Sequence, residues 1–306
     1  MSDPIRVAAL VGPTAVGKTA TSLALAERLG AEIVSIDSMQ IYRGMNIGTA
    51  KVSKTDRGRV AHHLLDLFDP AREVSVAEFQ SLARAAIGDI AERDRLPLLV
   101  GGSGLYFRAV VDDLEFPPRE PSVRKSLEEQ AEDLGSEALH ARLDEIDPKA
   151  ARRMESTNTR RIVRALEVIE ITGRPFSDND SWERFESRYS LSVAGFAMSR
   201  DRLFERIARR VDEMLDRGLV AEARSLAESG MSRTARQALG YRQVLDSGPD
   251  TEPEMLRDEI VRATKRFARR QESWFKADPR VAWFDAARPE LLEDLTAYFA
   301  PAASAP

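Results

Sequence analysis

The chain contains no cysteine, and this absence excludes several classes of protein. Structural disulfides, iron–sulfur clusters and cysteine-ligated zinc all need the missing thiol. Histidine is nearly as scarce, because only His62, His63 and His140 occur in 306 residues. A histidine metal site therefore has little support, and we expect these side chains to be structural.

Long apolar runs are also missing. The N-terminal apolar segment reaches only from about Ile5 to Val11 before a Gly-Pro turn. This is too short for a signal sequence or a membrane span, so we expect a cytoplasmic protein without a membrane partner. With 43% hydrophobic residues, the chain can form one large domain, or a core domain carrying a smaller inserted one.

Positive charge is not in excess, since the formal net charge is −5. A negative total is unusual for an RNA-binding protein, yet it does not describe how charge is distributed over the surface. Two segments are locally basic, one with Arg152, Arg153, Arg160, Arg161 and Arg164, the other with Arg262, Lys265, Arg266, Arg269 and Arg270. Taken alone, such segments are typical of a solvated helix face.

Strand and helix patterns alternate over the first hundred residues. A short apolar strand ends at Gly12, and a helical pattern from Lys18 to Leu29 ends at Gly30. The segment AEIVSID predicts a second strand that ends at Asp37, and LLVGG after Pro97 predicts a third. Such alternation indicates an α/β fold with a parallel sheet flanked by helices, whose ligands bind at the carboxyl ends of the strands.

Between the second and third strands, Ser75 and Glu78 have the form of a capping box that opens a helix to about Arg93. From about residue 119 to 189 the sequence is charged and helix-patterned, which predicts a small all-helical inserted domain. The core domain then comprises 1–118 and 190–300, with a strand at 191–198 and helical stretches at 201–229 and 254–275. Residues 301–306 form a low-complexity tail that we expect to be disordered.

A phosphate-binding loop is the strongest motif in the chain. The pattern G-x-x-x-x-G-K-[ST] is matched completely between a strand and a helix, by Gly12, Pro13, Thr14, Ala15, Val16, Gly17, Lys18 and Thr19. Its backbone N–H groups and the helix N-terminus favour phosphate oxygens, Lys18 supplies a cation, and the Thr19 hydroxyl can bind Mg²⁺. The motif predicts a diphosphate site without identifying the nucleotide or other compound that carries it.

Asp37 stands at the end of the second predicted strand, close to this loop. From spacing alone it could hold Mg²⁺ through water, act as a general base, or cap the following turn. Ser38, Gln40 and Tyr42 follow it and are suited to the edge and face of a base. The glycine-rich turn around Ser103 is a weaker signal, since strand-to-helix geometry alone can require it.

Taken together, these segments resemble one family, the tRNA dimethylallyltransferases, over nearly the whole chain. The matching blocks are GPTAVGKT at 12–19, DSMQIYRGMNIGTAK at 37–51, HHLLD at 62–66, GGSGLYFRA around Gly102, RRIVRALEV at 160–168, RIARRVDEMLDRGLVAEARSL at 206–226, ALGYRQVL at 238–245 and KRFARRQESWF at 265–275. Many blocks in one order are far more specific than any single block.

The resemblance implies transfer of a dimethylallyl group from dimethylallyl diphosphate to N6 of the adenosine immediately 3′ of the anticodon, in tRNAs reading codons that begin with U. Lys18, Thr19 and Mg²⁺ would then hold the diphosphate, and Asp37 would accept the N6 proton. Ser103, which stands where the family usually has threonine, would lie near the reacting groups. Arg206 or Arg210 would supply a further cation, with Arg206 as our choice for the catalytic set.

The resemblance also implies which residues contact tRNA. They are Asp37, Ser38, Met39, Gln40, Ser103, Arg124, Arg160, Arg161, Ile162, Val163 and Arg164. With tRNA as substrate, phosphate contacts become the favoured interpretation of the basic segments, including Arg269 and Arg270. One departure from the family pattern, at Glu155 to Asn158, puts local tRNA contacts in doubt without touching the chemistry.

Three other functions use part of the same sequence. An adenylate isopentenyltransferase would prenylate free AMP or ATP, but the basic C-terminal segments argue against it. A P-loop small-molecule kinase would consume ATP and leave the blocks from residue 160 onward unexplained. A non-enzymatic RNA-binding module would tolerate Asp37→Asn, whereas we expect that change to abolish transfer. We expect a monomer, with tRNA and an allylic diphosphate as its partners.

Overall fold

The computed structural model describes residues 3–178, 184–248 and 250–300. The chain forms two compact units, one made of Met1–Asp112 with Phe185–Pro306 and the other of Asp113–Arg184. The second unit covers residues 113–184, and from the sequence we expected an inserted helical domain at 119–189. The tail predicted at 301–306 lies outside the described residues.

The first unit is built on a six-stranded parallel sheet with the order β3-β2-β4-β1-β5-β6. Its strands are β1 (Arg6–Val11), β2 (Ala31–Ser35), β3 (His62–His63), β4 (Leu96–Gly101), β5 (Ser190–Ala197) and β6 (Val281–Asp285). The α/β fold with a parallel sheet is therefore confirmed. Val7 to Val11 are buried, as expected for a central strand covered on both faces.

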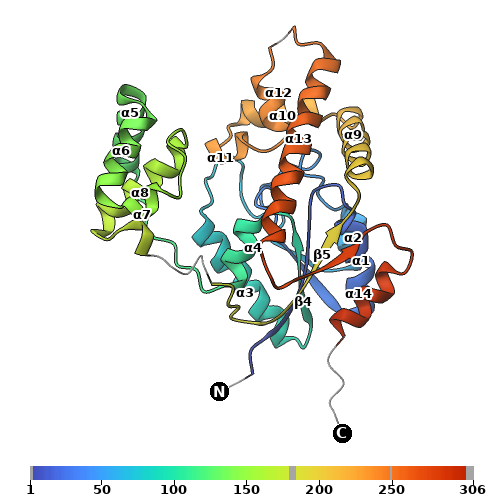
Figure 1. Cartoon of the computed structure of the whole chain (residues 1–306). Helices are drawn as coiled ribbons and strands as arrows, with labels where there is room; N and C mark the ends of the chain where they lie inside the picture. Colours follow the sequence, from blue (N-terminus) through green and yellow to red (C-terminus); the bar gives the residue numbers. More distant parts are fainter. Residues whose placement is uncertain (1–2, 179–183, 249, 301–306) are drawn as a thin grey trace. The chain divides into compact units, whose positions relative to one another are not determined.

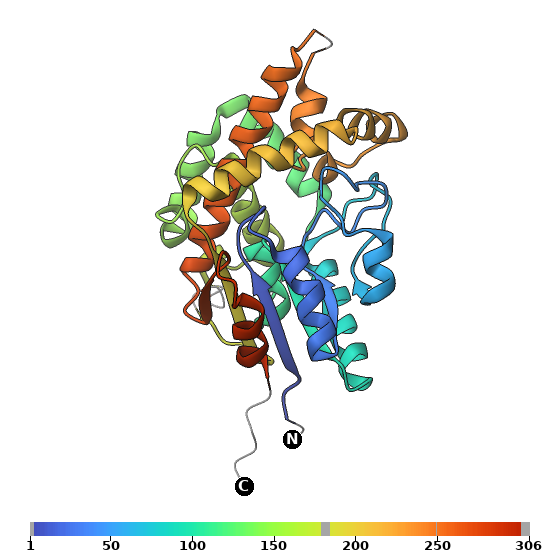
Figure 2. The same cartoon turned by 90° about the vertical axis from the view of Figure 1, so that its right-hand side faces the viewer.

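Helices flank this sheet and also extend beyond the carboxyl ends of its strands (Figures 1 and 2). They are α1 (Lys18–Leu29), α2 (Lys54–Arg59), α3 (Val76–Glu92), α4 (Gly104–Val111), α9 (Arg200–Asp216), α10 (Leu219–Ser229), α11 (Arg233–Arg236), α12 (Tyr241–Asp246), α13 (Pro253–Lys276) and α14 (Leu291–Phe299). Among the residues that the structure describes, no helix is both long and apolar enough to cross a membrane.

Local signals account for several helix ends. Helix α1 ends before Gly30, whose φ of 63° is the left-handed conformation favoured at that position. Helix α3 begins after Ser75, whose side chain accepts a hydrogen bond from Glu78 N at 3.1 Å. The Glu78 carboxylate pairs instead with Arg72, so the structure shows the Ser75 half of the predicted capping box.

Three details differ from the sequence-based expectations. The single helical stretch predicted at 201–229 was wrong, because Gly218 adopts a φ of 95° that separates α9 from α10. Strand β2 ends at Ser35, before the predicted Asp37, because the chain there leaves the sheet to form the following turns. Strands β3 and β6 were not predicted.

The second unit contains α5 (Pro121–Leu134), α6 (Ser136–Ile146), α7 (Pro148–Ala151), α8 (Thr159–Thr172) and a short 3₁₀ helix, η1 (Phe176–Asp178). It has its own apolar core, which includes Leu127, Leu143 and Leu166. One charged side chain is also buried there. The Glu167 carboxylate accepts hydrogen bonds from Arg124 at 2.9 Å and Arg164 at 2.8 Å, which satisfies its charge inside the unit.

Candidate active site

The phosphate-binding loop lies at the centre of the sheet's carboxyl edge, between β1 and α1. Gly12 and Gly17 have φ values of 141° and 114°, which side chains rarely adopt, so the two glycines permit the loop's tight course. Ala15 also has a positive φ, of 64°. A strained non-glycine residue in such a loop is a common feature of ligand sites.

Lys18 is folded back over its own loop. Its Nζ donates hydrogen bonds to the carbonyl oxygens of Gly12 at 2.8 Å and Pro13 at 2.7 Å. Burial and the nearby positive charge of Arg210 lower the pKa of Lys18 to about 7, against the opposing attraction of Asp37. An anionic ligand such as diphosphate would stabilise the charged form of Lys18.

Asp37 faces the same space from the turn that follows β2. One carboxylate oxygen accepts a hydrogen bond from Met39 N at 2.9 Å, which fixes the side chain. Burial raises the pKa of Asp37, although Met39 N, Lys18 and Arg210 favour the ionised carboxylate. A carboxylate made more basic in this way, within a cavity, is a suitable general base.

Helix α9 brings two arginines to the loop. Figure 2 shows α9, in gold, crossing above the connection between β1 and α1. Arg206 donates from Nε to the carbonyl oxygen of Ala15 at 2.8 Å, while Arg210 is the arginine whose charge acts on Lys18 and Asp37. Burial also lowers the pKa of Arg210. The sequence could not distinguish these two arginines. In the structure, Arg206 contacts the phosphate loop, and the charge of Arg210 acts on Lys18 and Asp37.

These groups surround a cavity of about 490 Å³. The charged and polar side chains that line it include Lys18, Thr19, Asp37, Gln40, Arg206, Arg209, Arg210 and Gln271. The cavity is large enough for a small diphosphate together with part of a base. Its lining joins positive side chains from two helices to the carboxylates of Asp37 and Glu213, an arrangement that can hold an anion and remove a proton.

Ser103 is the N-cap residue immediately before helix α4, at the end of the turn after β4, and is half-buried. It follows Gly101 and Gly102, which both line the cavity. Gly102 is required by close packing, because a Cβ there would lie 2.2 Å from Gln271 Nε2 and 2.8 Å from the Gly12 carbonyl oxygen. The glycine at position 102 is therefore required by its close contacts with Gln271 and with the phosphate loop, in addition to the geometry of the strand-to-helix turn.

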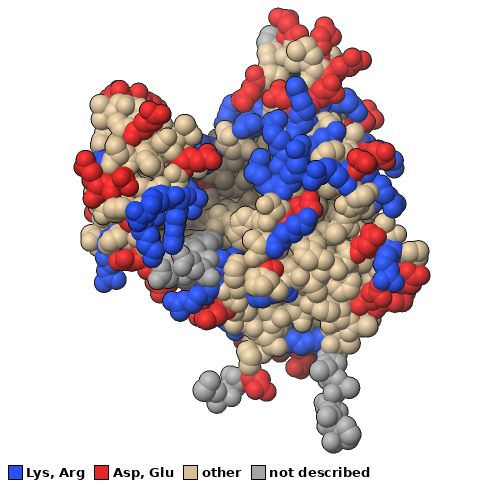
Figure 3. All heavy atoms as spheres, in the orientation of Figure 1, with Lys and Arg blue, Asp and Glu red and all other residues tan. Residues whose placement is uncertain are grey.

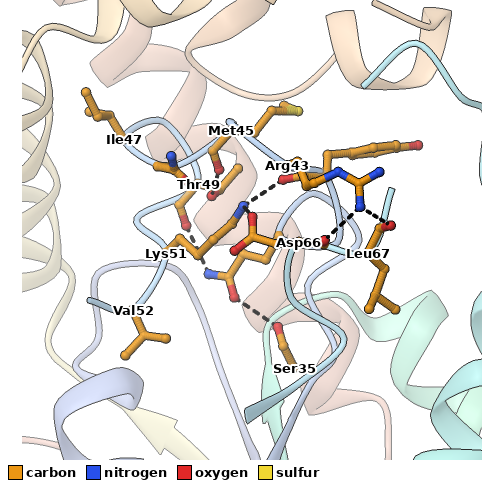
Figure 4. A network of polar contacts seen from close by, with 12 residues as sticks. Ser35, Arg43, Met45, Ile47, Thr49, Lys51, Val52, Asp66 and Leu67 are labelled. Carbon is orange, nitrogen blue, oxygen red and sulfur yellow. Dashed lines mark hydrogen bonds and ion pairs between the residues drawn. The ribbon is translucent and has the colours of Figure 1, made fainter. Parts of the chain in front are cut away.

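The segment after Asp37 is held by internal polar contacts (Figure 4). The Gln40 amide accepts a hydrogen bond from Ser35 Oγ at 2.9 Å and donates one to Thr49 O at 3.1 Å. The buried Lys51 donates to Asp66 Oδ1 at 2.6 Å, which joins two of the family-like blocks. Gln40 thus lines the cavity while its amide also stabilises the loop.

The residues expected to contact tRNA in the helical unit divide into three groups. Arg160 and Arg161 are exposed at the start of α8. Arg124 and Arg164 are partly exposed and both pair with Glu167. Ile162 and Val163 are buried in the core of the unit, so their side chains pack internally and are not available to a partner.

Helix α13 carries a second basic surface, defined by the exposed Arg262, Arg266, Arg269 and Arg270. Figure 3 shows Lys and Arg gathering over α13. The Arg269 guanidinium lies 5.5 Å from the ring centre of Phe204, which supports the arginine from α9. This surface belongs to the same unit as the cavity.

Burial excludes Tyr42, which the sequence suggested for the face of a base, from stacking on a substrate. Tyr42 and Tyr241 are both buried in the core, and the Tyr241 hydroxyl donates to Glu222 at 2.6 Å. Trp274 is half-buried and packs on the turn at Gly104. His63 is paired with Glu32 at 2.7 Å, and the described residues contain no group of three acidic or histidine side chains that could hold a metal ion.

Sequence reasoning did not select Arg209, Glu213 or Gln271, which also line the cavity. Arg209 and Glu213 belong to α9 and could have been found from their helical spacing to Arg206 and Arg210. Gln271 had a weaker signal, as the one uncharged polar residue after the run of arginines in KRFARRQ.

Comparison with known proteins gives a consistent result. The model of the IPP transferase family matches residues 40–278, and that of the isopentenyl transferase family matches residues 5–61. A tRNA dimethylallyltransferase from Streptomyces avermitilis is 54% identical over 94% of this chain and 93% of its own length. One from Corynebacterium jeikeium is 46% identical over 94% of each chain.

Solved structures agree in fold. The tRNA isopentenylpyrophosphate transferase of Bacillus halodurans has a TM-score of 0.71 and 42% identity, covering 96% of this chain and 95% of that one. A eukaryotic dimethylallyltransferase acting on tRNA has a TM-score of 0.80 at 23% identity, covering 96% and 77%, and so supports the fold alone. With its phosphate loop, the cavity arginines of α9 and matching blocks in one order, the chain belongs to the IPP transferase family, whose members here are named tRNA dimethylallyltransferases.

Proposed function

We propose that this protein transfers a dimethylallyl group from dimethylallyl diphosphate to N6 of the adenosine immediately 3′ of the anticodon, in tRNAs that read codons beginning with U. The products are N6-isopentenyladenosine in tRNA and diphosphate. The observation that carries the proposal is the meeting of Lys18, Asp37 and Arg210 around one cavity. Family membership and the names of the relatives support the choice of substrates.

The leaving group is diphosphate, so its growing negative charge must be stabilised as the allylic C–O bond breaks. The N–H groups of the phosphate loop, Lys18 and the arginines of α9 provide preorganised positive charge for this purpose. Lys18 exchanges its hydrogen bonds with Gly12 and Pro13 for bonds to phosphate oxygens. We assign Arg206 and Arg210 to the same step, with Arg210 closer to the reacting centre.

The nucleophile is the N6 amino group of adenine, whose lone pair is delocalised into the ring. Asp37 accepts a proton from N6 as the new C–N bond forms, an effect worth about 10²–10⁴-fold in rate. Its hydrogen bond from Met39 N fixes the direction of the carboxylate. Ser103 lies in the turn beside the loop and contributes a hydroxyl to the substrates. Gln40 lines the cavity, and we assign Ser38 and Met39, which precede it in the same turn, to contacts with the tRNA.

The residues present fit a magnesium ion bound chiefly through the substrate. Mg²⁺ in phosphate sites is usually held by one or two protein oxygens, phosphate oxygens and several waters. The Thr19 hydroxyl lines the cavity directly after Lys18, and Asp37 adds a carboxylate nearby. When bound there, the ion would neutralise charge on the diphosphate.

The tRNA contacts are assigned from charge and exposure. We propose that Arg160 and Arg161 of the helical unit contact phosphates, and that Arg124 and Arg164 do so through their exposed parts. The basic surface of α13 serves the same substrate. One chain carries every group proposed for the reaction, so we propose a monomer, and its tRNA substrate leads us to propose a cytoplasmic location.

A direct assay separates the proposed reaction from its alternatives. The purified protein is incubated with Mg²⁺ and labelled dimethylallyl diphosphate, with unmodified tRNA in one reaction and AMP with ATP in another. Label in tRNA with release of diphosphate supports the proposal. Label in AMP or ATP would move the protein to the adenylate isopentenyltransferases, and ATP hydrolysis without prenyl transfer would favour a kinase-like or switch function.

A further inference from the structure

One buried side chain joins the phosphate loop to the neighbouring turn. The Gln271 carboxamide, on α13, accepts a hydrogen bond from Thr14 N at 2.8 Å and donates one to Gly102 O at 2.9 Å. Thr14 belongs to the phosphate-binding loop, and Gly102 precedes Ser103 in the turn after β4. The two bonds need both a donor and an acceptor at one place, which an amide supplies.

The packing around Gln271 is equally specific. A Cβ on Gly102 would lie 2.2 Å from Gln271 Nε2, and a Cβ on Gly104 would lie 2.1 Å from the Trp274 ring. Gln271 and Trp274 are three residues apart on α13 and so project from the same face of the helix. The helix therefore contacts the turn at two successive points, and the missing side chains of Gly102 and Gly104 make the approach possible.

A buried polar side chain with a purely structural role needs only a hydrogen-bond partner, which the nearby backbone can supply. Thr264, on the same helix, shows that pattern, because its buried hydroxyl donates to Ile260 O within α13. Both bonds of Gln271 instead leave the helix and end on two loops that line the cavity. This difference links the residue to the geometry of the site.

We infer that Gln271 is a positioning residue, whose amide holds the phosphate loop and the Gly102–Ser103 turn in the arrangement that binds the diphosphate of the substrate. The inference deepens the proposed function and rests on it for the identity of the substrate. Gln271 shares its helix with the basic surface made by Arg262, Arg266, Arg269 and Arg270, so one rigid element joins that surface to the diphosphate site.

Binding of inorganic diphosphate tests the inference without depending on prenyl transfer. Calorimetric titration would compare the unchanged protein with Gln271→Met, which keeps the length of the side chain and removes both hydrogen bonds. Loss of two such bonds predicts a dissociation constant raised by about tenfold or more. The matched control is Thr264→Val, which removes a buried hydroxyl from the same helix and should leave the constant within about twofold.

A second variant keeps the inference testable if Gln271→Met does not fold. Gly102→Ala places a methyl group against the Gln271 amide and should weaken diphosphate binding in the same way, with melting curves recorded for every variant. In steady-state assays, Gln271→Met should raise the KM for dimethylallyl diphosphate and leave the dissociation constant of tRNA unchanged. Normal diphosphate binding by Gln271→Met, or an equal loss in Thr264→Val, overturns the inference.

The inference and the proposed function can fail separately. If the unchanged protein prenylates no tRNA while Gln271→Met still weakens diphosphate binding, the positioning role stands and the assigned reaction is wrong. If the unchanged protein prenylates tRNA and Gln271→Met binds diphosphate normally, the reaction stands and the positioning role is wrong.

Discussion

Both units of the molecule enclose charged side chains, but the charge of Glu167 in the helical unit and the charges at the cavity of the α/β unit are compensated to different extents. In the helical unit, Glu167 is fully buried and paired with Arg124 and Arg164; burial opposes its ionisation, yet the arginine hydrogen bonds outweigh it and lower its pKa. At the cavity of the α/β unit, burial dominates instead, so the pKa of Lys18 falls and that of Asp37 rises.

This contrast distinguishes charges that stabilise a fold from charges that await a ligand. Glu167 has its partners within its own unit, and the cluster needs nothing further. Within the described part of the chain, Lys18 Nζ bonds to neutral carbonyl oxygens, at Gly12 and Pro13, and those contacts do not offset its burial. A site whose buried charges lack full compensation within the protein binds an ionic substrate more strongly, because the substrate provides the missing opposite charge.

The largest expected effect comes from Asp37→Asn. This change keeps the shape of the side chain but removes the base, so kcat should fall by about 10²–10⁴-fold while tRNA binding stays close to normal. Single-turnover prenyl transfer and filter binding would measure the two quantities. Asp212→Asn on α9, which removes an exposed partner of Arg257, serves as control and should retain activity. Full turnover by Asp37→Asn would remove the general-base assignment.

Glu167→Gln should have the next largest effect, by lowering stability without weakening diphosphate binding. Neutralising the carboxylate leaves Arg124 and Arg164 without their buried partner, which should cost about 3 kcal/mol of unfolding free energy. Urea denaturation followed by circular dichroism measures this loss. Glu129→Gln, in an exposed pair with Lys125, should cost less than about 0.5 kcal/mol. An equally small loss at Glu167, or weaker diphosphate binding, would contradict the distinction between the Glu167 cluster and the cavity charges.

The pH dependence of diphosphate binding should show the smallest effect. Lys18 titrates at about 7 in the free protein, and a bound diphosphate raises its pKa by favouring the charged form. Affinity must therefore fall as the pH rises above about 7, by up to about tenfold per pH unit, since the neutral lysine has to take up a proton. Lys18→Arg, which stays charged, should flatten the profile between about pH 7 and 9. A flat profile in the unchanged protein would mean that Lys18 is already charged.

Features coded by neighbouring residues could be predicted from the sequence. The phosphate loop, the end of α1 at Gly30 and the start of α3 at Ser75 all follow from local backbone and capping chemistry. The break at Gly218 also had a local signal, which the long helical periodicity on either side concealed. Strand β3 has two residues only and is held by its pairing with β2, a contact that no local pattern reveals.

The candidate site was predictable where its residues stand beside a motif, and less so where distant segments meet. Lys18, Thr19 and Asp37 follow the ends of strands, so the topology of a parallel sheet brings them together. Arg206 and Arg210 lie one helical turn apart, and only the placement of α9 decides which reaches Ala15. Gln271 is 257 residues from Thr14, so their hydrogen bond follows from the packing of α13 alone.

The order of segments along the chain also governs how the protein can be synthesised. Residues 113–184 are contiguous and have their own core, so the helical unit can fold while the rest of the chain is still being made. The phosphate loop emerges first, yet its contacts with Arg206 and Gln271 wait for α9 and α13. A ribosome-bound chain therefore displays an incomplete diphosphate site until α13 has been made, and a motif translated before both helices matures only after them.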